Sequence, residues 1–374
     1  MPPIIELVDL DSRRDVRRFV DLPYRLYARD PRWVPPLRRE VAIALDRTRH
    51  PYYEHSDAAF FLASRNGRVV GRIGALEHRP YNRAHGIQAA SFALFECEED
   101  EQAAVALFTA LFDWARCRGL SRVVGPRGLG AFDGYGVLVD GFERRQLMTM
   151  TPYNPPWYAR ALERLGFAKE VDFVSFGLRS DSFVMPDAVA RAAERAAGDL
   201  RIVRYPTRRA LVRAARRIGE TYNRAFVANW EYYPLTEREI DFAVEQVRPL
   251  ADRRLMTFIA AGDEVVGFLL AFPDVSAALQ RMRGRLTPWG IARLLIERRR
   301  TRAVALNGAG IVPEFQGRGG NALLYVQIER AIRESGFEEA ELPQVAETAT
   351  RMRRDLERLG ARPLKTHRVY ARDL

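Results

Sequence analysis

The chain has 374 residues, of which 47% are hydrophobic, which is enough for two cores of ordinary size and excludes a disordered protein. Its formal charge of +11 would suit an acidic partner, but all but two of the 59 basic residues are arginine and they are spread along the whole chain, which indicates a compositional preference instead. No apolar run approaches the roughly 20 residues that span a bilayer, and two cysteines are too few for a disulfide framework.

The first strand-like segment, Ile4 to Leu10, begins almost at the N-terminus, which leaves no room for a signal peptide. Since Cys97 and Cys117 suit a reducing compartment, the expected location is the cytoplasm, without a membrane span. The five histidines have no metal-ligand spacing with other ligands, so we expect no metal site.

The sequence of the first half predicts a capped helix, a hairpin and an α/β segment. Asp11 or Ser12 can cap the first helix. Asn66-Gly67 is a strong signal for a β-hairpin between two apolar runs. A strand at 91–96 and a helix at 102–118 follow, and the glycine-rich stretch 125–141 predicts an irregular loop.

Five carboxylates stand at the start of that second helix, namely Glu96, Glu98, Glu99, Asp100 and Glu101. They suit the positive end of the helix dipole but would repel an anionic ligand. This half is therefore expected to lack an anion site at the helix.

The second half opens with helices at 207–226 and 236–247, joined by the aromatic segment Trp230, Glu231, Tyr232 and Tyr233. A hairpin at 255–272 precedes an arginine-rich insertion, Asp274 to Arg300, in which Pro288 interrupts any continuous helix. A basic amphipathic helix can bind nucleic acid or a membrane, or it can be a solvated face packed against its own domain. A lid or part of the acceptor site is a further possibility for this insertion, and nucleic acid is not the expected partner.

A β-type run from Arg302 to Val312 then enters a turn with three glycines in four positions, and a helix at 321–334 leaves it. Such a strand-turn-helix presents backbone N–H groups at the positive end of a helix, where glycine lets an anion approach closely. The expected ligand is a phosphate or pyrophosphate. The order fits neither the P-loop nor the dinucleotide fingerprint.

The turn resembles motif A of the GNAT N-acetyltransferase superfamily, Gln/Arg-x-x-Gly-x-Gly/Ala, in the form Gln316-Gly317-Arg318-Gly319-Gly320-Asn321. Asn321 departs from the usual Gly or Ala, although asparagine tolerates left-handed backbone and can cap a helix. The pattern of Leu22-Pro23-Tyr24 with the segment 30–37 resembles an uncharacterised bacterial group of GNAT-like proteins.

An internal repeat extends this resemblance over most of the chain. Phe61-Leu62-Ala63 recurs as Phe258-Ile259-Ala260, and the Leu-Glu-Arg-Leu-Gly segment 162–166 recurs at 356–360. We therefore expect an α/β (α+β) protein of two tandem GNAT-like domains, each a mixed, mostly antiparallel sheet flanked by helices. The expected boundaries are 1–180 for a degenerate N-terminal domain, 181–199 for a linker and helix, and 200–374 for the domain with the acyl-CoA motif.

The resemblance implies that the second domain binds acetyl-CoA or another acyl-CoA. Its cofactor residues would be Ile311, Val312, Gln316, Gly317, Arg318, Gly319, Gly320 and Asn321, and the aromatic segment, Trp230, Glu231, Tyr232 and Tyr233, would contact the substrate. The tyrosine that many members use as general acid is replaced by Leu356, and Asn307 stands where a carboxylate base is often found. Glu314, Tyr325 and Glu347 remain as candidates for catalysis.

The sequence thus predicts an acyl-CoA-dependent N-acyltransferase that transfers an acetyl group to a small-molecule or peptide amine. A non-catalytic acyl-CoA-binding or scaffold protein is the main alternative, favoured by Leu356 and Asn321, and an aminoacyl- or lipid-directed acyltransferase is a third. The formation of a homo-oligomer is left open.

Overall fold

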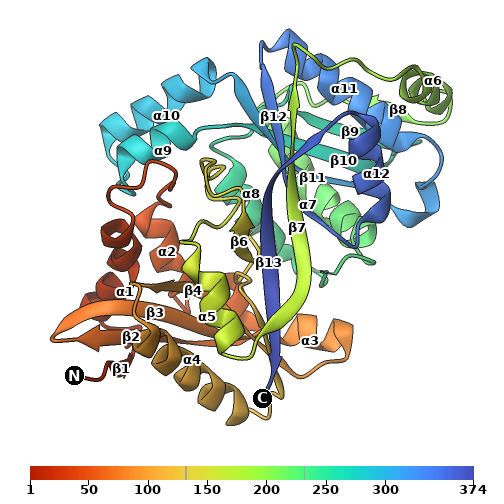
Figure 1. Cartoon of the computed structure of the whole chain (residues 1–374). Helices are drawn as coiled ribbons and strands as arrows, with labels where there is room; N and C mark the ends of the chain where they lie inside the picture. Colours follow the sequence, from red (N-terminus) through yellow and green to blue (C-terminus); the bar gives the residue numbers. More distant parts are fainter. Residues whose placement is uncertain (131–132, 231) are drawn as a thin grey trace. The chain divides into compact units, whose positions relative to one another are not determined.

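The computed structural model describes residues 1–130, 133–230 and 232–374 (Figure 1). The chain forms two compact units. Unit 1 comprises Met1–Val174, Ser276–Leu294 and Lys365–Leu374, and unit 2 comprises Ser175–Val275 and Leu295–Leu364. Three elements belong partly to each unit: β7 (Ala168–Arg179), α10 (Pro288–Arg300) and β13 (Arg362–Asp373).

The sheet of unit 1 is mixed, with the strands in the order β1-β2-β3-β4-β5-β13. Neighbours from β1 to β4 are antiparallel, whereas β4 and β5 are parallel. The last residues of the chain complete this sheet, because β13 pairs with both β5 and β6. Its strands are β1 (Ile4–Leu7), β2 (Asp57–Arg65), β3 (Arg68–Glu77), β4 (Ala89–Cys97), β5 (Arg122–Gly125) and β6 (Val137–Asp140). Its helices are α1 (Arg13–Leu26), α2 (Arg38–Ala44), η1 (Pro51–Glu54), α3 (Arg79–His85), α4 (Glu101–Arg116), α5 (Trp157–Arg164) and α9 (Ser276–Met282).

Local sequence signals account for several of these elements. Ser12 is the N-cap of α1, where its side chain accepts a hydrogen bond from the Asp15 N–H at 3.3 Å. Asn66 and Gly67 both have positive φ, which is the backbone that a tight hairpin between β2 and β3 requires. The prediction of an irregular loop over 125–141 was wrong in part, because residues 137–140 pair with β13 as β6.

The arginine-rich insertion forms two helices that are separated near Pro288, as the sequence predicts. Helix α9 ends at Met282, and Pro288 is the first residue of α10. Helix α9 packs into unit 1, where the Met148 N–H donates to Ser276 Oγ at 2.7 Å and Gln280 donates to the Trp33 carbonyl at 2.9 Å.

The sheet of unit 2 has the order β8-β9-β10-β11-β12, and the end of β7 lies next to β12. Strands β8 to β11 are antiparallel to their neighbours, and β11 and β12 are parallel. The strands are β8 (Arg201–Val203), β9 (Met256–Ala261), β10 (Glu264–Pro273), β11 (Ala303–Ile311) and β12 (Glu339–Ala346). The helices are α6 (Asp187–Ala196), α7 (Arg208–Ala225), α8 (Glu237–Val247), η2 (Pro313–Phe315), α11 (Gly320–Glu334) and α12 (Thr350–Arg358).

Helices cover both faces of this sheet. On one face α6 and α11 pack against β9 and β10 around Ile259, Leu269 and Ile328. On the other face α7 packs Tyr222 and Phe226 against Phe268 of β10, with stacked rings 4.6 to 6.3 Å apart. The two units therefore repeat one order, β2-β3-β4-α4-β5 and β9-β10-β11-α11-β12, which is the order expected from the internal repeat.

Candidate functional site

The glycine turn joins β11 to α11 as the sequence predicts. Its left-handed residues are Gly317, with φ of +79°, and Gly319, with φ of +80°. Gly319 is the N-cap of α11, and no side chain caps the helix. The first N–H groups of α11 therefore have no partner within the helix and can bind an anion. Asn321, expected as a possible cap, lies instead in the first turn of the helix and is exposed.

The three glycines of the turn have different surroundings. A Cβ at Gly317 would meet no atom within 4 Å, so this residue faces open space. A Cβ at Gly319 would lie 2.9 Å from the carbonyl oxygen of Ala192 in α6, and one at Gly320 would lie 2.8 Å from Ile311. Gly319 and Gly320 thus allow the helices to pack, whereas Gly317 is the glycine at which a ligand can approach.

Several residues near the turn already form hydrogen bonds or ring contacts within the protein. Ile311 and Val312 are buried, and the Val312 N–H donates to the Val266 carbonyl at 2.9 Å, so this group is not available to a ligand. Gln316 donates to the Ile311 carbonyl at 3.1 Å and accepts from Arg351 at 3.3 Å. Arg318 is exposed and stacks over the ring of Phe315. Arg318 and Arg351 supply positive charge beside the turn.

Strand β11 separates from β12 before it reaches the turn. Within residues 303–346 the parallel register covers only Ala303–Ala305 paired with Glu339–Glu341. On its other edge β11 has a bulge between Leu306 and Ala309, where Gly308 has φ of +105°. The separation leaves space between the two strands and the helices above them.

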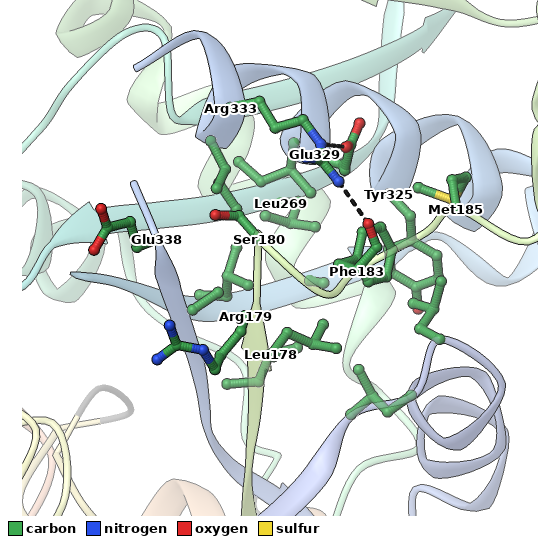
Figure 2. A pocket seen from close by; sticks show the side chains of 18 of the residues that line it. Leu178, Arg179, Ser180, Phe183, Met185, Leu269, Tyr325, Glu329, Arg333 and Glu338 are labelled. Carbon is green, nitrogen blue, oxygen red and sulfur yellow. Dashed lines mark hydrogen bonds and ion pairs between the residues drawn. The ribbon is translucent and has the colours of Figure 1, made fainter. Parts of the chain in front are cut away.

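A largely apolar hollow of about 760 Å³, which includes the part open to solvent, occupies this space (Figure 2). Five segments line it: the end of β7 with the linker after it, β10 and β11, α11, β12, and α12. The apolar side chains are Leu178, Phe183, Met185, Leu269, Leu306, Ala309, Tyr325, Ile328, Ile332, Ala340, Leu342, Met352, Leu356 and Leu359. This apolar lining fits a small-molecule site.

Polar groups lie along one side of the hollow and hold the linker in place. Arg333 of α11 pairs with Glu329 and donates to the Phe183 carbonyl at 2.6 Å (Figure 2). The linker is also tied to the start of β12, because the Ser180 N–H donates to the Glu338 carbonyl at 2.8 Å. Phe183 and Met185 are thereby fixed over the hollow.

The structure separates the three candidates for catalysis. Tyr325 lines the hollow, with its hydroxyl 3.3 Å from Met352 Sδ and 3.5 Å from Asp355 Oδ2, and burial raises the pKa of its phenol well above the ordinary value. Glu314 is exposed beside the turn and pairs with Arg224 at 3.4 Å. Glu347 lies in the turn after β12 and is partly buried. Of the three, only Tyr325 lines the hollow.

The aromatic segment expected to contact substrate lies elsewhere. Tyr233 is buried, with its hydroxyl 3.4 Å from Glu239, the glutamate of the capping box of α8. Trp230 and Tyr232 are partly buried, and Glu231 lies outside the described residues. None of the described residues of this segment lines the hollow.

The corresponding turn in unit 1 is built differently. Asp100 is the N-cap of α4, accepts from the Ala103 N–H at 3.1 Å and pairs with Arg65 at 2.9 Å. Glu98 pairs with Arg68 at 2.5 Å. The carboxylates of this half therefore satisfy the end of their own helix, in contrast to the uncapped α11.

Glu96, at the end of β4, is held by two tyrosines of unit 1. Tyr27 donates to its carboxylate at 2.5 Å and Tyr158 at 3.1 Å. Burial raises the pKa of Glu96 to about 7, against the opposing effect of the nearby Arg72. The folded protein therefore binds the Glu96 proton more tightly than the unfolded chain does.

Stability should fall as the pH rises from about 4.5 to about 7, because the folded protein retains a proton that the unfolded chain releases. Replacing Glu96 with glutamine should remove this contribution, which is on the order of 3 kcal/mol. The measurement is the melting temperature of both proteins across this pH range. Parallel profiles for the two proteins would show that Glu96 titrates normally in the fold.

No protein-family model matches the sequence. The chain is similar to the bacterial ceramide synthase of Caulobacter vibrioides, with 28% identity over 377 residues that cover 99% of this chain and 98% of the relative. It is also similar to the protein YghO of Escherichia coli, with 27% identity over 372 residues that cover 97% and 94% of the two chains.

Among the similar solved structures, two examples match over nearly the whole length of both chains. The tandem GNAT protein from the clavulanic acid biosynthesis pathway has a TM-score of 0.57 and 14% identity, with coverage of 99% of this chain and 98% of that one. A GCN5-related N-acetyltransferase from Sphaerobacter thermophilus has a TM-score of 0.53 and 14% identity, with coverage of 99% and 95%. The chain therefore has the tandem GNAT fold, which confirms the fold expected from the sequence. Among its described helices, none combines the length and the apolar character needed to cross a bilayer.

Sequence reasoning predicted the linker but missed the hollow and the contribution of the linker to its wall. The apolar run Phe183-Val184-Met185 was a signal that this segment packs against the protein. The bulge also had a signal, since Asn307-Gly308 inside a strand is typical of one.

Proposed function

We propose that unit 2 binds an acyl-CoA and transfers its acyl group to an amine. The observation that supports this most directly is that an apolar hollow and an uncapped helix N-terminus are built on the same two elements, β11 and α11. The N–H groups at the start of α11 would hold the pyrophosphate, with Gly317 giving close approach. The hollow would hold the acyl chain.

A long acyl chain fits this site better than the acetyl group expected from the sequence. The lining is mainly leucine, isoleucine, phenylalanine and methionine, which a long alkyl chain can contact and the single methyl of an acetyl group cannot cover. Leu356 stands where many GNAT members have a tyrosine, and here its side chain adds to the apolar wall. Each buried methylene of a bound chain contributes about 0.8 kcal/mol.

The similarity to a bacterial ceramide synthase supports the same proposal and suggests the acceptor. Ceramide is the amide of a fatty acid and a long-chain amino alcohol. We therefore propose a long-chain amine, rather than a peptide, as the acceptor.

In the proposed reaction the amine attacks the thioester carbonyl, the C–S bond breaks and the C–N bond of the amide forms. The amine releases one proton, and the CoA thiolate accepts one from solvent. The phenol of Tyr325 is protonated at neutral pH, and burial raises its pKa further, so it can donate a hydrogen bond to the substrate. It is a poor proton donor to a thiolate, since an ordinary thiol has a pKa of about 8.5.

The test is a single-turnover assay of the purified protein with palmitoyl-CoA and sphinganine, with detection of the amide by mass spectrometry. We expect amide formation and release of one CoA per amide, at a higher rate than with acetyl-CoA. Tight binding of palmitoyl-CoA without any amide product would favour the non-catalytic acyl-CoA-binding protein. Failure to bind either thioester would contradict both functions.

A further inference from the structure

The exposed apolar side chains of the protein are concentrated at α10. Eleven large apolar residues are exposed within the described chain, and five of them lie between residues 286 and 296. These five are Leu286, Trp289, Ile291, Leu295 and Ile296, and Trp289 is 80% exposed. Single exposed apolar residues are normal, but a cluster of this kind marks an interaction surface.

The same segment is strongly basic. Residues 281–300 contain seven arginines and a single acidic residue, Glu297. Within the part of the chain that the structure describes, five of these arginines form no ion pair, namely Arg283, Arg285, Arg293, Arg299 and Arg300. Arginines at the end of a helix suit its dipole, but this does not account for the apolar residues among them.

Helical geometry places the two kinds of residue together. At 100° per residue, Trp289, Leu295, Ile296 and Arg299 fall within an arc of about 120°. Gly290, on the opposite side of α10, is buried. One side of the helix therefore packs on the protein, and the other presents apolar and cationic groups to solvent.

We propose that α10 and the turn before it, residues 283–300, bind the surface of a lipid bilayer that contains anionic lipids, with the helix lying in the plane of the interface. Tryptophan, leucine and isoleucine would enter the boundary between headgroups and acyl chains, while the arginines would bind lipid phosphates. At 13 residues the helix is too short to span a bilayer.

A lipid surface fits these residues better than nucleic acid does. Nucleic-acid contacts come mainly from arginine, lysine and polar donors to phosphates, and the exposed isoleucine and leucine residues would gain nothing there. The proposal does not rest on the proposed acyl transfer, because binding to the membrane is measured without substrate.

The experiment uses the full chain and vesicles of phosphatidylcholine with or without phosphatidylglycerol, separated by flotation. We expect binding to the anionic vesicles to be at least about tenfold tighter, since each arginine near such a surface strengthens binding roughly fivefold. The double variants W289S/L295S and R299E/R300E should each lose at least about tenfold in affinity. The matched control is Val105→Ser, which removes an exposed apolar side chain from α4 and should leave binding unchanged.

Three outcomes would overturn the proposal. The first is an absence of vesicle binding by the unmodified protein at low salt, and the second is equal binding by W289S/L295S with its melting temperature preserved. The third is a dimer in sedimentation that W289S/L295S abolishes, since a second copy of the chain would then cover this face.

Discussion

Replacing Gly317 with glutamate should weaken the binding of an acyl-CoA by about 100-fold or more while the fold is retained. An added Cβ at Gly317 meets no atom within 4 Å, so the substitution does not displace packed atoms at this position. The added carboxylate would lie at the uncapped start of α11, where the pyrophosphate is proposed to bind. At a separation of about 4 Å, the repulsion between a carboxylate and each phosphate charge is worth about 1 to 4 kcal/mol. Two such charges are enough for a loss of this size.

The control is Gly336→Glu, at the other end of the same helix. Gly336 has φ of +73° and also has no atom within 4 Å of an added Cβ, so the backbone strain of the two substitutions is matched. Gly319 is unsuitable for this purpose, because its side chain would press on the Ala192 carbonyl and disturb α6. Calorimetric titration with palmitoyl-CoA measures both variants. Equal affinities would show that the turn does not bind the cofactor.

The sequence predicts the elements of the site well, because they depend on local chemistry. The helix expected at 321–334 is observed at Gly320–Glu334. The repeated segment Leu-Glu-Arg-Leu-Gly ends α5 and α12 alike, with left-handed Gly166 and Gly360 just beyond each helix. A repeat of this kind constrains the backbone directly, so it can be recognised without knowledge of the packing.

The hollow could not be predicted in the same way, because its walls come from segments that are distant in sequence. Phe183 and Ile332 face one space although about 150 residues separate them, and no local pattern relates the two. The sequence also could not predict that Gly319 allows close packing while Gly317 faces open space. The contact of Gly319 depends on where α6, the helix after the linker, packs against α11. Motif spacing predicts the anion site, whereas the packing of the linker forms the hollow that we propose for the acyl chain.

The identity of the acyl group depends on whether the hollow is its binding site, and Leu356→Trp tests this directly. Leu356 is only 1% exposed and lines the hollow, so a larger ring at this position should fill the space without reaching the glycine turn. Loss of contact for only four methylenes would remove about 3 kcal/mol, or more than 100-fold in affinity for palmitoyl-CoA. Binding of acetyl-CoA should change little, because its affinity would come from the pyrophosphate and not from the chain.

The companion variant Leu356→Ala enlarges the hollow and should retain palmitoyl-CoA binding, which separates the filling of the space from a general disturbance of α12. Both titrations are compared at a temperature below the measured melting points, since truncation of a buried leucine can destabilise the protein by about 2 to 5 kcal/mol. If Leu356→Trp binds palmitoyl-CoA as the unmodified protein does, the acyl chain lies outside this hollow. If it loses both thioesters equally while folded, the hollow holds the pantetheine arm common to both, and the length of the acyl chain is selected elsewhere.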